Sequence, residues 1–235
     1  MQQTFELFGT AHLASLLVVG VLAILLPLGV RRLRPDWARP VAWLLALLLL
    51  AQETVHLWQV AARYGLGAEL LPLDLSAMAV LLSAWVLLTG SPRVFEIIYF
   101  WAFSATTQAL LTPDLAEGFP SLRYILFFLS HGLVVVSVCY AMIVYRLRPY
   151  PASIPRAAGM TLAFAVLVAV ANLQLGTNFM YLMAKPDRPS LMDWLGPWPW
   201  YWLSLLGLAL LAFLVLYAPW FIADRRGRRR NATGR

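Results

Sequence analysis

The stretch AHLASLLVVGVLAILLPLGVRRLR, residues 11–34, decides the fold class of this chain. Its first 20 residues contain no Asp, Glu, Lys or Arg, and three arginines follow within the next four positions. An α-helix of ~20 apolar residues crosses the ~30 Å hydrocarbon core of a bilayer. Because no basic residue precedes the block and no small-residue cleavage pattern follows it, we interpret it as a retained membrane-spanning helix rather than a signal peptide.

Six further apolar blocks follow, separated by short breaks that contain Pro and Gly. The chain of 235 residues is 61% apolar and 12% charged, whereas a soluble domain carries about 25% charged residues. The single cysteine, Cys139, excludes an internal disulfide. The sequence therefore predicts an all-α polytopic membrane protein, a bundle of seven transmembrane helices. We expect these helices at Ala11–Val30, Pro40–Ala61, Leu71–Leu88, Val94–Leu111, Leu122–Tyr145, Ala157–Leu175 and Tyr201–Phe221.

The basic residues predict the orientation of the bundle. Of the 18 Lys and Arg residues, 14 fall in alternate breaks and the C-terminal tail, and 4 fall in the breaks on the opposite side. Cytoplasmic loops are the Arg-rich ones, so the N-terminus is expected outside and the C-terminus in the cytoplasm. We interpret residues 1–223 as one transmembrane domain and 224–235 as a basic cytoplasmic tail. The net charge of +7 then reports membrane topology, and no nucleic-acid partner is expected.

Strongly polar side chains lie toward one end of six of the predicted helices. Measured at ~1.5 Å per residue, they fall in the half of the bilayer nearer the predicted outer side. The opposite half contains little besides Leu, Val, Ala and aromatic residues. Because a channel needs polar lining from face to face, this pattern argues against conduction. It favours a polar cavity open to the outer side.

The candidate catalytic residues are Ser76, His131, Asp74 and Glu53. A serine near a helix start lies beside free backbone N–H groups that can stabilise an oxyanion. His131, at comparable depth, supplies the base that a serine nucleophile needs, with Asp74 or Glu53 orienting or balancing the imidazole. The alternative for Asp74 or Ser76 is a helix cap. Glu53 and His56, three residues apart, share a helix face and form either a functional pair or a satisfied buried pair.

Other polar residues of the same half are candidate substrate contacts, with interhelical hydrogen bonding as the alternative role. Lys185 is expected to pair with a phosphate or with Asp74. Three histidines with two carboxylates raise the question of a metal, but zincin spacing is missing, so no metal and no cofactor are expected. The candidate substrate-binding residues are His12, His56, Gln108, Asn172, Asn178, Lys185 and Trp198.

Several ordered motifs carry a resemblance to a known family. These are Glu96-Ile-Ile-Tyr-Phe-Trp-Ala, Gln108 to Asp114, Phe127-Phe-Leu-Ser-His131-Gly, Asn178 to Pro186 and Leu195-Gly-Pro-Trp-Pro-Trp-Tyr201. Over nearly its whole length the chain resembles the YwaF-like bacterial integral membrane proteins. The resemblance implies a multi-pass protein of the bacterial inner membrane. It also implies kinship with the eukaryotic transmembrane acyltransferase that remodels ether phospholipids and, distantly, with the androgen-induced membrane hydrolases.

The same resemblance implies roles for two residues. Carried over by position, Ser76 is the nucleophile and His131 the histidine that activates it. The sequence departs from the family pattern, in which position 76 is commonly Cys and position 74 often another polar residue. A serine needs stronger base assistance than a thiol.

The leading functional hypothesis is an acyl-ester or phospholipid hydrolase, or an acyltransferase, that meets its lipid substrate in the membrane. The alternative is a protein that binds or transports a small solute, a proton or a metal ion through Glu53, His56 and His131 without covalent chemistry. A structural subunit without a ligand is a third hypothesis.

Overall fold

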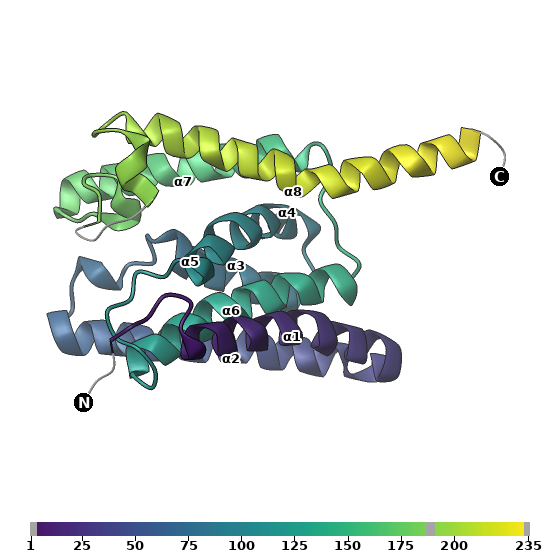
Figure 1. The fold of residues 1–235 in the computed structure, drawn as a ribbon, viewed down its shortest axis with the longest axis horizontal. Coiled ribbons are helices and arrows are strands. Elements are labelled where there is room, and N and C mark those ends of the chain that lie inside the picture. The colour runs from purple at the N-terminus through teal and green to yellow at the C-terminus, as the bar shows by residue number, and fades with distance from the viewer. Residues whose placement is uncertain (1–3, 187–190, 233–235) are drawn as a thin grey trace.

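The computed structural model describes residues 4–186 and 191–232, and the side chains of residue 191 and of residues from 228 onward lie outside that description (Figure 1). In the described part of the chain, seven segments are long and apolar enough to cross a membrane, which confirms the predicted fold class. The α-helices are α1 (Thr10–Leu33), α2 (Ala38–Tyr64), α3 (Leu75–Thr89), α4 (Pro92–Trp101), α5 (Thr107–Leu111), α6 (Leu122–Ile143), α7 (Ser153–Leu175) and α8 (Tyr201–Ala232). Short 3₁₀ helices lie at Pro35–Trp37, Ala68–Leu70, Phe179–Tyr181 and Leu191–Leu195.

The helices form two groups that meet at α4 (Figure 1). Helix α6 packs against α1, α2 and α3, and α2 also packs along α3. Helices α7 and α8 lie together on the other side of α4, and α8 extends past the remaining helices at its C-terminal end (Figure 1). The candidate residues of α2, α3 and α6 therefore belong to one group of packed helices.

The fourth predicted span contains a feature that the sequence did not reveal. Its helix passes from α4 through a π-helix, Ala102–Thr106, into α5. The Thr107 hydroxyl donates to the Ala102 carbonyl oxygen at 2.9 Å, and the Ser104 hydroxyl donates to the Phe100 carbonyl oxygen. These hydroxyls donate to backbone carbonyl oxygens at the π-helical turn, where the regular α-helical hydrogen-bond pattern is interrupted. Backbone polar groups inside a membrane need such partners because no water is available there.

The half of the bundle predicted to face the cytoplasm is closed by buried aromatic side chains. Phe95, Phe100 and Tyr140 have no exposed surface. The Tyr140 hydroxyl donates to the Ala38 carbonyl oxygen, and the Tyr99 hydroxyl donates to the Leu216 carbonyl oxygen at 2.9 Å. The hydroxyls of Tyr99 and Tyr140 thus connect helices in this half.

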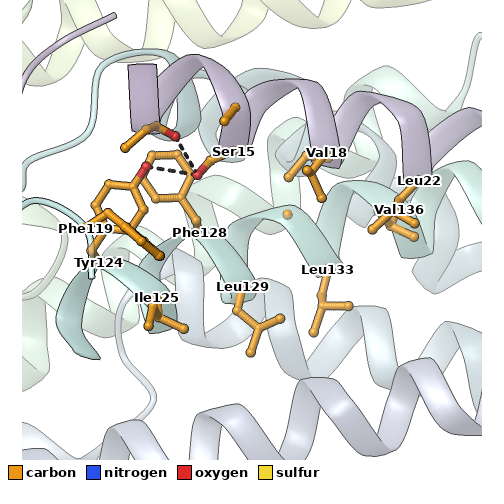
Figure 2. Close-up of a pocket in the computed structure, with 14 residues that line it drawn as sticks. Ser15, Val18, Leu22, Phe119, Tyr124, Ile125, Phe128, Leu129, Leu133 and Val136 are labelled. Atoms are coloured by element: carbon orange, nitrogen blue, oxygen red, sulfur yellow. Dashed lines mark hydrogen bonds between the residues drawn. The ribbon is translucent and has the colours of Figure 1, made fainter. Parts of the chain in front are cut away.

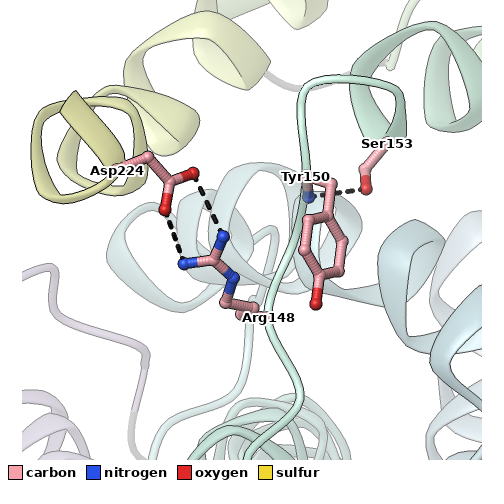
Figure 3. Close-up of polar contacts among 4 residues, drawn as sticks. All are labelled: Arg148, Tyr150, Ser153 and Asp224. Carbon is pink, nitrogen blue, oxygen red and sulfur yellow. Dashed lines mark hydrogen bonds and ion pairs between the residues drawn. The ribbon is translucent and has the colours of Figure 1, made fainter. Parts of the chain in front are cut away.

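Helix α8 continues without a break across the predicted boundary between residues 223 and 224. Arg148 donates two hydrogen bonds to Asp224, at 2.8 and 3.1 Å, in the bidentate arrangement shown in Figure 3. These bonds raise the pKa of the Arg148 guanidinium. The guanidinium also lies 4.9 Å from the ring centroid of Tyr150, whose backbone N–H is bound by Ser153. The segment after α6 therefore holds α8 in place beyond the expected end of the span at Phe221.

Candidate functional site

His131 is the tenth residue of α6 and is held by its own helix. One ring nitrogen, Nδ1, lies 2.9 Å from the carbonyl oxygen of Phe127, and the ring stacks on the Phe127 ring at 4.2 Å between centroids. A carbonyl oxygen only accepts hydrogen bonds, so Nδ1 carries the proton and Nε2 presents a lone pair. This is the tautomer that a general base requires. In the described residues neither Asp74 nor Glu53 bonds to the ring, so the Phe127 carbonyl takes the orienting role expected of them.

Ser76 is the second residue of α3 and is exposed. The first helical hydrogen bond of this end joins the Met78 N–H to the Asp74 carbonyl oxygen, so the N–H groups of the preceding positions have no acceptor within the helix. Across the described part of the chain, the Ser76 hydroxyl has no hydrogen-bond partner, and no bond joins it to His131. Because α3 packs against α6, the hydroxyl and the imidazole lie on neighbouring helices.

Asp74 occupies the N-cap position of α3, but its side chain makes no capping bond there. Its carboxylate instead accepts a hydrogen bond of 3.1 Å from the backbone N–H of Met180, in the segment that follows α7. Met180 and Tyr181 both have positive φ, at 57° and 53°, which is uncommon for residues other than glycine. Asp74 therefore connects the start of α3 to a turn of unusual backbone conformation.

His56 and Glu53 lie on α2 near this region. His56 is exposed, and its helix packs against α6, which carries His131. Glu53 accepts a hydrogen bond of 3.3 Å from the side chain of Gln52, which is itself buried. Within the described residues, Glu53 and His56 share no hydrogen bond.

Both ring nitrogens of His12 have hydrogen-bond partners within the protein. It is 1% exposed, its Nδ1 accepts from the Phe8 N–H at 2.9 Å, and its Nε2 lies 2.8 Å from the Leu110 carbonyl oxygen. The ring also packs against Phe5 and Phe128. With both nitrogens occupied, His12 holds the N-terminal segment against α5 and α6, and no ring nitrogen remains to contact a substrate.

Asn172 and Asn178 organise the turn that follows α7. Asn172 is buried, its Nδ2 donates to the Phe179 carbonyl oxygen at 3.0 Å, and its Oδ1 accepts from the Phe179 N–H at 2.9 Å and the Thr177 hydroxyl at 2.8 Å. Asn178 donates to the Ala184 carbonyl oxygen and accepts from the N–H groups of Met183 and Ala184. Both amides therefore act on backbone groups, a local role that the sequence did not indicate.

The remaining candidate contacts also have partners. The Trp198 indole N–H donates to the Leu182 carbonyl oxygen at 3.2 Å, and the Gln108 amide donates to the Thr112 hydroxyl at 2.7 Å. Lys185 Nζ lies 5.7 Å from the ring centroid of Tyr201. No ion pair joins Lys185 to Asp74 in the described ranges. In the described ranges these three side chains therefore contact other groups of the protein itself.

Tyr181 is a residue that the sequence analysis missed. Its hydroxyl contacts the Asp114 carboxylate at 3.5 Å, and its carbonyl oxygen accepts from the Tyr201 hydroxyl. Burial raises the pKa of the Tyr181 hydroxyl, and the nearby carboxylates of Asp114 and Asp74 raise it further. The segment 178–182 consequently joins α3, α8 and the connection before α6. The sequence indicated Tyr181 only as an aromatic residue shortly after the turn-forming residues Gly176-Thr177-Asn178.

The fold defines a polytopic membrane protein, in which Ser76 and His131 lie on the neighbouring helices α3 and α6. Residues 7–217 match the TMEM164 family. The chain belongs to that family.

One relative supports the same relationship without adding a function. The chain is 30% identical, over 161 residues, to an uncharacterized protein of Treponema pallidum (strain Nichols). The match covers 67% of this chain and 65% of that protein, so the alignment spans somewhat less than two thirds of the relative. No solved structure matches the chain.

Proposed function

We propose that this protein cleaves or transfers acyl groups of membrane lipids, with Ser76 as nucleophile and His131 as general base. The observation that carries the proposal is the hydrogen bond from His131 Nδ1 to the Phe127 carbonyl oxygen at 2.9 Å. It leaves the Nε2 lone pair as the only basic site of the ring. Membership of the TMEM164 family and the resemblance to YwaF-like proteins and their eukaryotic acyltransferase relatives support the same chemistry.

The proposed reaction uses Ser76 and His131 in turn. The Ser76 oxygen attacks the ester carbonyl of the lipid while His131 Nε2 takes the hydroxyl proton, and the N–H groups at the start of α3 stabilise the oxyanion. The carbon–oxygen bond to the lysolipid then breaks, and the imidazolium gives its proton to the departing alcohol. Water or a second lipid alcohol removes the acyl group from Ser76 by the reverse sequence, which yields hydrolysis or transfer.

The test is labelling of the full-length protein in lipid nanodiscs with a fluorophosphonate, followed by turnover of a phospholipid ester. Ser76→Ala is expected to abolish both signals. Ser83→Ala is the matched control, because Ser83 lies on the same helix but is 1% exposed and out of reach of the reagent. Labelling that persists in Ser76→Ala, or full turnover by that variant, refutes the proposal.

The alternative function is the binding or transport of a small solute, a proton or a metal ion through Glu53, His56 and His131. Its support is the packing of α2, which carries Glu53 and His56, against α6, which carries His131. In the described residues no three His, Cys, Asp or Glu side chains are arranged to hold a metal ion. Proton-coupled solute uptake that is lost in Glu53→Gln and kept in Ser76→Ala would favour this function over acyl transfer.

A further inference from the structure

An apolar groove runs between α1 and α6 on the outside of the bundle (Figure 2). It has a volume of about 390 Å³. Its lining is almost entirely hydrocarbon, and Val18 and Leu129 border it with 55% and 39% of their surface exposed. In a chain with seven membrane-spanning segments, such a face is covered by lipid. The remaining question is whether the groove selects one part of a lipid.

The hydroxyl groups that line the groove lie at one of its ends. The Ser15 hydroxyl donates to the Ala11 carbonyl oxygen at 3.0 Å and lies 2.9 Å from the Tyr124 hydroxyl (Figure 2). Both residues lie in the first turns of their helices, at the end predicted to face outward. From there to Leu22 and Val136 the lining is apolar. This gradient matches an amphiphile whose polar group is at the outer surface and whose chain points toward the membrane centre.

The dimensions of the groove fit a single hydrocarbon chain. Between Ala11 and Leu22 the groove is about 16 Å long at 1.5 Å per residue. Its volume divided by that length gives a mean cross-section of about 24 Å², which leaves room for one extended polymethylene chain.

The groove lies mainly on another face of α6 than His131. Its α6 residues, including Ile125, Leu129, Gly132 and Val136, recur every three or four positions and form one stripe. At 100° per residue, His131 is about 160° around the helix from Leu129 and about 100° from Gly132. It is closer in angle to the lining residue Tyr124, which lies seven residues, or about 10 Å, nearer the start of α6. At Gly132 an added Cβ would lie 2.6 Å from the Val19 side chain, so α1 and α6 are in close contact behind the groove.

We propose that this groove is a binding site for one acyl chain of an outer-leaflet phospholipid, with the headgroup beside Ser15 and Tyr124. Lipids elsewhere on the protein contact exposed ridges of side chains, whereas a chain in the groove has protein on several sides. The additional van der Waals contacts retain it longer than the surrounding lipid. This site does not depend on acyl-transfer activity.

The test uses the full-length protein in nanodiscs of phosphatidylcholine, a fraction of which carries a diazirine in one acyl chain. After irradiation, mass spectrometry is expected to find the groove residues of α1 and α6 labelled at least about threefold more than other lipid-exposed residues, an excess that a few additional contacts provide. Ala14→Phe and Val18→Phe each fill the groove and should remove the excess. Ala51→Phe, on a lipid-exposed position of α2, should leave it unchanged.

Three results would overturn the proposal. The first is even labelling of all exposed helix faces in the unsubstituted protein. The second is an excess that survives in both groove-filling variants, each shown by gel filtration and thermal unfolding to be folded. The third is a protein–protein cross-link between α1 of one copy and α6 of another, which would assign the groove to a second chain.

Discussion

Replacing Asn172 by Ala tests whether the turn after α7 is held by this one side chain. The substitution removes the three hydrogen bonds to Phe179 and Thr177. At about 1 kcal/mol net for each bond, the loss in the free energy of unfolding is about 3 kcal/mol. For a chain of this size, that loss lowers the midpoint of thermal unfolding by roughly 6–12 °C.

The assay is tryptophan fluorescence during thermal unfolding in detergent micelles. Thr177→Val provides the graded comparison, because it removes one of the three bonds and is expected to cost about a third as much. Limited proteolysis should cleave the Asn172→Ala variant within residues 176–186 sooner than the unsubstituted chain. A midpoint that moves by less than about 2 °C in Asn172→Ala, or an equal effect of Thr177→Val, refutes this account of the turn.

Three further predictions concern other parts of the chain. Ser76→Cys should increase turnover of acyl esters, because a thiolate is the better nucleophile; a turnover equal to that of Ser76→Ala would contradict this. Arg148→Lys should destabilise the end of α8 by about 1 kcal/mol, because lysine cannot form the bidentate pair with Asp224. Arg34→Lys, at an ion pair about 60% exposed, is the control and should have no effect. The rate of proteolysis near the end of α8 compares the two variants. Gly90→Ala should cost about 1 kcal/mol because Gly90 ends α3 at φ 67°. Gly20→Ala lies inside α1, where a Cβ meets open space and alanine is the better helix former, so it should not lower the midpoint of thermal unfolding.

The sequence predicted the spans well because membrane insertion imposes a simple rule on length and composition. The expected starts of the helices at Leu122 and Tyr201 match the structure, as does the end at Leu175. The start of the third span was placed at Leu71, whereas α3 begins at Leu75. Residues 71–74 are not helical, and the Asp74 carboxylate accepts a hydrogen bond from the Met180 backbone N–H. Hydropathy reports burial in lipid and is insensitive to such local turns.

The candidate site was predictable in part. Depth along each helix grouped Ser76, His56 and His131 at one end, and this grouping stays a prediction. The structure shows that the helices carrying them, α2, α3 and α6, pack against one another. Depth could not separate side chains that face a shared region from those that bind their own loop. Asn172 and Asn178 are of the second kind, since hydrogen bonds to nearby backbone depend on turn geometry that no residue spacing encodes.

The π-helix Ala102–Thr106 has a consequence for the comparison of relatives. A turn closed between residues five apart holds one residue more than an α-helical turn. A homologue without this turn would lack one residue here, and every side chain of α5 would then be displaced by about 100° around the axis. A single-position gap within residues 102–106 in an alignment would therefore mark which members present the same face of the fourth span to α6.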